Sequence, residues 1–78
     1  MTKEEVKKLI SVHNNLTDTK NSMVRLSNTK LLNTKLNSEE YKTVASKISV
    51  NIDILREMIM ESGFLVNSNF EKLKLYYD

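Results

Sequence analysis

The sequence predicts an all-α protein, in which a long antiparallel helical hairpin is followed by a short C-terminal helix. The chain of 78 residues contains no proline and one glycine, so few positions can break a helix. Two long stretches, about 3–28 and 38–62, repeat apolar residues at steps of three and four, which is the spacing of one helix face. A polar segment, about 29–37, would connect them as a loop. This length suits one small three-helix domain over 1–78, and a dimer stays open.

The first predicted helix starts with a capping box, because Thr2 is followed three residues later by Glu5. Its apolar face contains Val6, Leu9, Ile10, Leu16, Met23 and Val24. His13 and Lys20 interrupt that face. They are either a hydrogen-bonded histidine at the rim and a lysine that extends to solvent, or a charge pair or pH-sensitive contact at a partner interface. The spacing by seven of Leu9, Leu16 and Met23 is typical of a coiled-coil seam, so a homodimer is one alternative.

The second predicted helix starts at Asn37, which can cap it together with Glu40. Its apolar face contains Tyr41, Val44, Ala45, Ile48, Ile52, Leu55 and Ile59. Gly63 fits the left-handed position that ends helices, and Phe64 could fold back onto Ile59. The opposite face carries Asp53, Glu57 and Glu61 at steps of four, an acidic ridge that is either solvated or suited to a basic partner.

Two segments outside these helices carry further predictions. The motif Asn-Thr-Lys-Leu occurs twice between residues 28 and 37, with a period of five that fits neither helix nor strand. We expect a loop there, with Lys30 and Lys35 as candidate contacts, although an extension of the first helix stays open. At the C-terminus, Ser68 and Glu71 form another capping-box pattern ahead of an apolar face of Phe70, Leu73, Tyr76 and Tyr77. This pattern predicts a short helix over about 69–77 that forms only if this face docks on the other two helices or on a partner.

Composition excludes several classes of function. The absence of cysteine and the single histidine exclude a disulfide framework and disfavour a metal site, so we expect no metal, cofactor or small-molecule ligand. No apolar run is long enough to span a bilayer and the N-terminus lacks a signal-peptide pattern, so a cytoplasmic protein without membrane contact is expected. The chain is rich in Asn, Lys and Ile, which suits a bacterial, phage or mobile-element origin.

The net charge of +2 is unevenly distributed. The segment from Met1 to Asn37 is net basic and the segment from Ser38 to Gly63 is net acidic, so the two would complement each other when antiparallel. A helix-turn-helix reading of residues 41–62 would place Asp53, Glu57 and Glu61 on the recognition helix, where DNA phosphates repel them. Nucleic-acid binding is therefore disfavoured and reduces to weak contact with the basic first helix.

A short segment of the second helix resembles a known family. The residues Ser49-Val50-Asn51-Ile52-Asp53-Ile54-Leu55 are similar to the Ser-x-x-Leu-Asp-x-Leu core of the small sporulation aspartyl-phosphate phosphatases. The resemblance covers these residues alone and implies a helical hairpin that dephosphorylates a response regulator, with Ser49 and Asp53 at the motif positions. The chain departs from that pattern at Val50, Asn51 and Arg56.

The favoured prediction is a small non-enzymatic regulator, such as an inhibitor, an antagonist or an adaptor, that binds another protein. The sequence contains no Gly-rich phosphate loop and no nucleophile placed beside a histidine, so no catalytic residue is predicted. The candidate partner-binding residues are Asp53, Glu57, Glu61, His13, Lys20, Lys30 and Lys35. The phosphatase and the weak nucleic-acid binder are the alternative functions.

Overall fold

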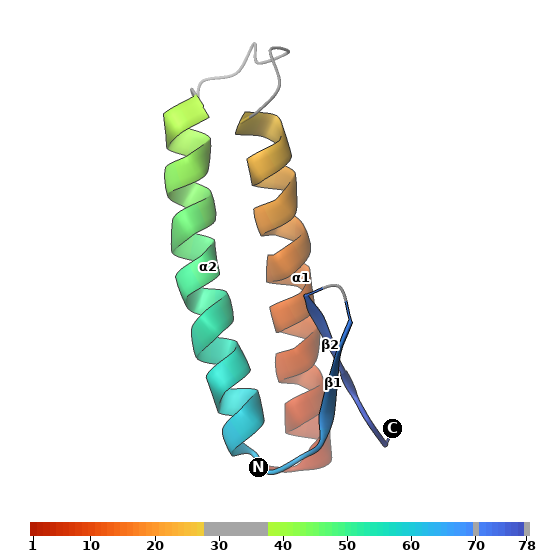
Figure 1. Ribbon diagram of the computed structural model, residues 1–78. Helices are drawn as coiled ribbons and strands as arrows, with labels where there is room; N and C mark the ends of the chain where they lie inside the picture. Colours follow the sequence, from red (N-terminus) through yellow and green to blue (C-terminus); the bar gives the residue numbers. More distant parts are fainter. Residues whose placement is uncertain (28–37, 70, 78) are drawn as a thin grey trace.

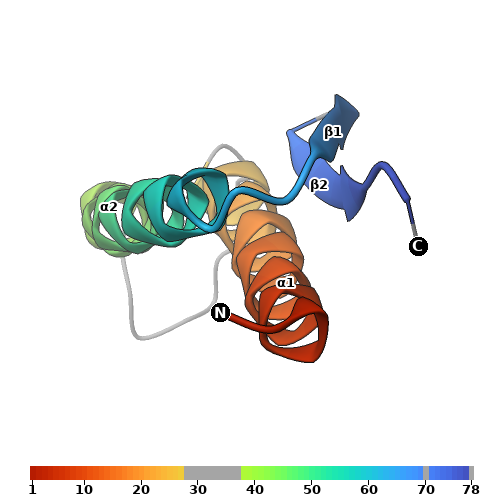
Figure 2. The ribbon, with the colours of Figure 1, turned by 90° about the horizontal axis from the view of Figure 1, so that it is seen from below.

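Two long antiparallel helices and a small two-stranded sheet make up the computed structural model, which describes residues 1–27, 38–69 and 71–77 (Figure 1). Helix α1 spans Lys3–Ser27 and helix α2 spans Ser38–Glu61. Strand β1, Val66–Asn69, pairs antiparallel with strand β2, Lys72–Leu75. Both views place α1 between α2 and the sheet, with β2 nearer to α1 than β1 is (Figure 2).

The predicted pair of long helices is confirmed, and so are two of the predicted helix ends. The backbone N–H of Thr2 donates to Glu5 Oε1 at 2.9 Å, and the N–H of Glu5 donates to Thr2 Oγ1 at 3.2 Å. These reciprocal bonds satisfy donors that the first turn of α1 leaves without a helical partner. Gly63 follows α2 with a φ of +84°. Glycine adopts this left-handed conformation readily, whereas residues that carry a side chain rarely do. The predicted loop at 29–37 and the Asn37 cap lie outside the described residues.

The capping box makes stability depend on pH through Glu5. The N–H of Thr2, followed by the Thr2 hydroxyl, lowers the pKa of the Glu5 carboxyl below its ordinary value of 4.5. A lowered pKa in the folded state means that this contribution is present above pH 4.5 and is lost as the pH falls through the folded value. Urea unfolding should therefore show wild type more stable than Glu5→Gln near neutral pH, with the difference shrinking below pH 4.5. The matched variant Glu4→Gln should show a smaller difference, and equal pH profiles for the two variants would contradict the assignment.

The apolar core lies at the end of the helical hairpin where α1 begins and α2 ends. Its buried residues come from every element except β1: Val6, Ile10, Ile59, Leu73 and Leu75. Leu9, Phe64 and Val66 pack against this cluster while partly exposed. Phe64 thus folds back onto the cluster that contains Ile59, as predicted. Farther along α2, the inner face buries Tyr41, Ala45 and Ile52.

The predicted C-terminal helix at about 69–77 is wrong, because the chain forms a β-hairpin there. In the sequence Lys72-Leu73-Lys74-Leu75, the lysines are exposed and both leucines are buried, which is the two-residue period of a strand. The predicted helix face would bury Tyr76 and Tyr77, which are 57% and 71% exposed. A helix of this length could bury only one of the two leucines against the core, whereas a strand places both on one face. Glu71, which directly precedes β2, has a φ of +70°, and the turns of tight hairpins often require such a positive φ.

The capping-box reading of Ser68 and Glu71 fails for the same reason. Ser68 lies within β1 and opposes Leu73 across the sheet. The Ser-x-x-Glu spacing is therefore coincidental here, while the same type of spacing at Thr2 forms a true cap.

Candidate functional site

A buried polar cluster joins α1, α2 and the β-hairpin. His13 is fully buried, and its Nδ1 lies 3.0 Å from Asn14 Oδ1. Because an amide oxygen only accepts hydrogen bonds, this contact assigns the imidazole proton to Nδ1. The other ring nitrogen, Nε2, then accepts from Arg56 Nε of α2 at 3.4 Å. His13 therefore fits this cluster as a neutral imidazole that connects the two helices.

The side-chain amide of Asn14 holds the β-hairpin against α1. Its Nδ2 donates to the carbonyl of Leu73 at 2.8 Å, and its Oδ1 accepts from the N–H of Leu73 at 2.8 Å. The amide thus pairs with the outer edge of β2 as a neighbouring strand would. Arg56 Nη2 also donates to the carbonyl of Glu71 at 3.1 Å, so α2 contributes to the same docking.

Ion pairs add a second, exposed set of contacts between α1 and the hairpin. Lys72 Nζ lies 2.9 Å from Asp18 Oδ1, and Lys20 Nζ lies 3.9 Å from Glu71 Oε2. Exposed pairs of this kind contribute little to stability, about 0–1 kcal/mol each, so they orient the hairpin more than they hold it. Lys20, a candidate partner contact in the sequence, is engaged within the molecule.

The outer face of α2, defined by Val50, Asp53, Ile54, Glu57, Met58 and Glu61, is exposed. Val50 and Ile54 are each two residues from the buried Ile52, about half a turn around the helix, and so point away from α1. Val50, Ile54 and Met58 are 59%, 50% and 40% exposed and recur at steps of four. The carboxylates of Asp53, Glu57 and Glu61 lie beside them and make no hydrogen bond or ion pair within the part of the chain that the structure describes.

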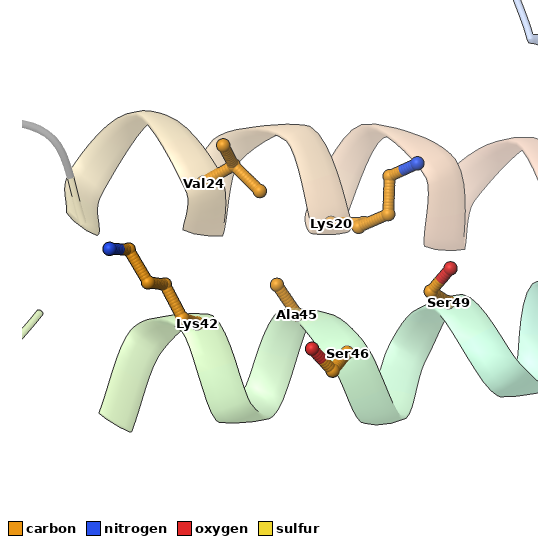
Figure 3. A pocket seen from close by; sticks show the side chains of 6 residues that line it. All are labelled: Lys20, Val24, Lys42, Ala45, Ser46 and Ser49. Carbon is orange, nitrogen blue, oxygen red and sulfur yellow. The ribbon is translucent and has the colours of Figure 1, made fainter. Parts of the chain in front are cut away.

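A shallow groove of about 430 Å³ lies between the helices, beyond the tip of the β-hairpin. Figure 3 shows Val24 of α1 pointing toward Ala45 of α2, with Lys42, Ser46 and Ser49 beside them, while the Lys20 side chain of α1 turns away from α2. The Lys42 ammonium and the hydroxyls of Ser46 and Ser49 give the groove a polar rim over a small apolar floor, while Lys20 Nζ lies 3.9 Å from Glu71 Oε2. Among the described residues, its lining includes no carboxylate or imidazole that could serve as a general base.

The structure separates the residues that the sequence put forward as a site. Asp53, Glu57 and Glu61 come together on the outer face of α2, while His13 lies in the interior and Lys20 lines the groove. Lys30 and Lys35 lie outside the described residues. For the phosphatase resemblance, Ser49 is half-buried in the groove, Asp53 is exposed on the outer face, and Arg56 contacts His13.

Sequence reasoning missed the roles of Asn14 and Arg56, since both depend on the position of a hairpin that was predicted as a helix. The sequence pattern assigned Ile54 and Met58 to one flank of the apolar stripe of the second helix, whereas both are exposed in the structure. The available signal was the recurrence of Val50, Ile54 and Met58 at steps of four, separate from the buried residues.

Comparisons with known proteins add no assignment, since no family model, curated protein or solved structure matches this chain. Within the described ranges, no group of three or more His, Asp or Glu side chains is placed to hold a metal ion. Neither described helix has the length and apolar character needed to cross a membrane.

Proposed function

We propose that this protein is a small non-enzymatic regulator that binds another protein through the outer face of α2. The observation that carries the proposal is the exposed stripe of Val50, Ile54 and Met58 beside Asp53, Glu57 and Glu61. Apolar side chains at steps of four, flanked by charge of one sign, are what an amphipathic segment of a partner would contact.

The chemistry of this face specifies the partner's chemistry. Three carboxylates at steps of four repel one another by a few tenths of a kcal/mol per pair, and a cation brought between them relieves that repulsion. A partner segment with lysines or arginines beside a leucine-like apolar row would complement both features, with the charges favouring rapid and selective association. The proposed occupant is therefore a basic amphipathic segment of another protein.

A site-specific photo-crosslinker tests this proposal. Introduced at Ile54 in cells that make the protein, it should form an adduct with another protein, and the crosslinked peptide should be basic and amphipathic. The same group at Ser11, on the exposed side of α1, should give no such adduct. Adding Glu57→Lys and Glu61→Lys to the Ile54 probe should abolish the adduct.

Two results would contradict this proposal. Equal labelling from positions 54 and 11, or an adduct that survives both charge reversals, would mean that the outer face of α2 is only solvated surface. Glu4→Lys serves as the charge control, because it reverses an exposed helical carboxylate on α1 and should leave the adduct unchanged. Circular dichroism of each variant would verify that the helices are intact.

A further inference from the structure

Hydrogen-bonded and non-hydrogen-bonded residue pairs alternate along the β-hairpin, and this alternation determines which backbone groups of β1 face away from β2. The N–H of Tyr76 donates to the carbonyl of Leu65 at 2.9 Å, so this pair is hydrogen-bonded. Because hydrogen-bonded and non-hydrogen-bonded pairs alternate in an antiparallel ladder, the pairs of Val66 with Leu75 and Ser68 with Leu73 are non-hydrogen-bonded. The bonds between Asn14 and both backbone groups of Leu73 independently support this assignment, because they show that the Leu73 N–H and C=O face away from β1.

The two edges of the sheet therefore differ in whether their outward backbone groups are hydrogen-bonded. On the β2 edge, the outward groups of Leu73 are satisfied by Asn14. On the β1 edge, the N–H and C=O groups of Val66 and Ser68 point outward, and within the described residues no hydrogen bond outside the ladder reaches them. Figure 2 shows β1 on the far side of β2 from α1, and neither of the two described helices covers this edge. It is an open template for another strand.

We propose that the β1 edge pairs with β1 of a second copy of this chain, forming a four-stranded antiparallel sheet across a two-fold axis. A register that places Asn67 opposite Asn67 of the other copy makes Val66 oppose Ser68. Val66 of each copy then forms a hydrogen-bonded pair with Ser68 of the other copy. All the outward backbone N–H and C=O groups of these two residues are bonded as a result. The contact is self-complementary, as a two-fold interface must be.

The side chains of β1 favour its own copy as the occupant. The strand Val66-Asn67-Ser68-Asn69 contains no charged residue and no proline, so pairing it with itself opposes no like charges and loses no N–H. On the outer side of the sheet, Asn67 meets its counterpart and Asn69 covers part of Leu65, which is 65% exposed. Four strands also relieve the marginal stability of an isolated pair.

Cysteine crosslinking reads this register directly, since the natural chain contains no cysteine. At position 67 the paired Cα atoms would be about 4.5 Å apart, within reach of a disulfide. Asn67→Cys should therefore form a disulfide-linked dimer on mild oxidation. In the control Asn69→Cys the two cysteines would be about 13 Å apart along the strands and should crosslink at least about tenfold more slowly. Equal rates for the two variants would overturn the proposal.

Sedimentation velocity of the unmodified protein provides the second measurement. Its mass should rise toward a dimer with concentration, and Ser68→Pro should raise the dimer dissociation constant by more than about tenfold. Proline at this position removes an N–H that the hairpin itself does not use, and Ser68→Ala is the matched control that keeps it. A wild-type protein that stays monomeric at millimolar concentration would overturn the proposal, because only a strand of another protein could then use this edge.

This inference is independent of the proposed function, and the two fail separately. Ile54→Asp on the outer face of α2 should leave the sedimentation of the protein unchanged. Conversely, Ser68→Pro should leave the photo-crosslinked adduct from Ile54 in place.

Discussion

Replacing Leu73 by alanine is expected to lower the free energy of unfolding by about 2–5 kcal/mol, the range for removing a buried leucine side chain. Leu73 is 3% exposed and belongs to the core cluster that joins the hairpin to both helices. Because a small domain has a modest total stability, this change could leave a substantial fraction of the molecules unfolded at room temperature. Urea unfolding monitored by circular dichroism measures the effect.

The neighbouring residue provides the control and discriminates strand from helix. Lys74 is exposed, so Lys74→Ala should change the free energy of unfolding by less than about 0.5 kcal/mol. Leu75, which is 6% exposed, should behave like Leu73, and Tyr76 should behave like Lys74. If Tyr76→Ala were as damaging as Leu75→Ala, the alternating burial of β2 would be contradicted.

The second large effect is expected at Asn14. Asn14→Ala removes both bonds to the Leu73 backbone and leaves the Nδ1–H of the buried His13 without its acceptor. Leaving such groups unsatisfied costs about 1–3 kcal/mol each where they are buried, so we expect a loss of about 2–4 kcal/mol. Hydrogen exchange by NMR should show the Leu73 amide losing its protection along with those of β1 and β2.

The adjacent asparagine is the matched control for this change. Asn15 is exposed on α1, and the bond that it makes, from the Thr19 hydroxyl, uses its backbone carbonyl. Asn15→Ala should therefore leave the Leu73 amide protected. A Leu73 amide that stays protected in Asn14→Ala would show that the apolar contacts of Leu73 and Leu75 hold the hairpin by themselves.

Some features of this fold could be predicted from the sequence, and others depended on the tertiary structure. The helical hairpin could be predicted because helix formation depends on spacings within one segment, such as the stripe through Tyr41, Ala45 and Ile52. The Thr2–Glu5 box and Gly63 are local signals as well, so the start of α1 and the end of α2 could be placed from them. The acidic ridge is local in the same way, since residues four apart on a helix are neighbours.

The C-terminal hairpin could not be settled in this way. Residues 69–77 contain both a helix-like spacing, Phe70, Leu73 and Tyr76/Tyr77, and a strand-like alternation, Lys72 to Leu75. A segment this short has little preference of its own, so the surface available for docking decides. That surface is Val6 and Ile10 of α1 with Ile59 of α2, which accepts two leucines on one side of a strand.

The sequence by itself determined the two helices, their inner faces and the charged outer face of α2, because each of these follows from residues close together in one segment. Only the tertiary structure decided the fold of the C-terminus, the burial of His13 and the free edge of β1. The physical reason is distance along the chain: Asn14 satisfies the backbone of Leu73, and Arg56 reaches His13, only after the three elements have come together.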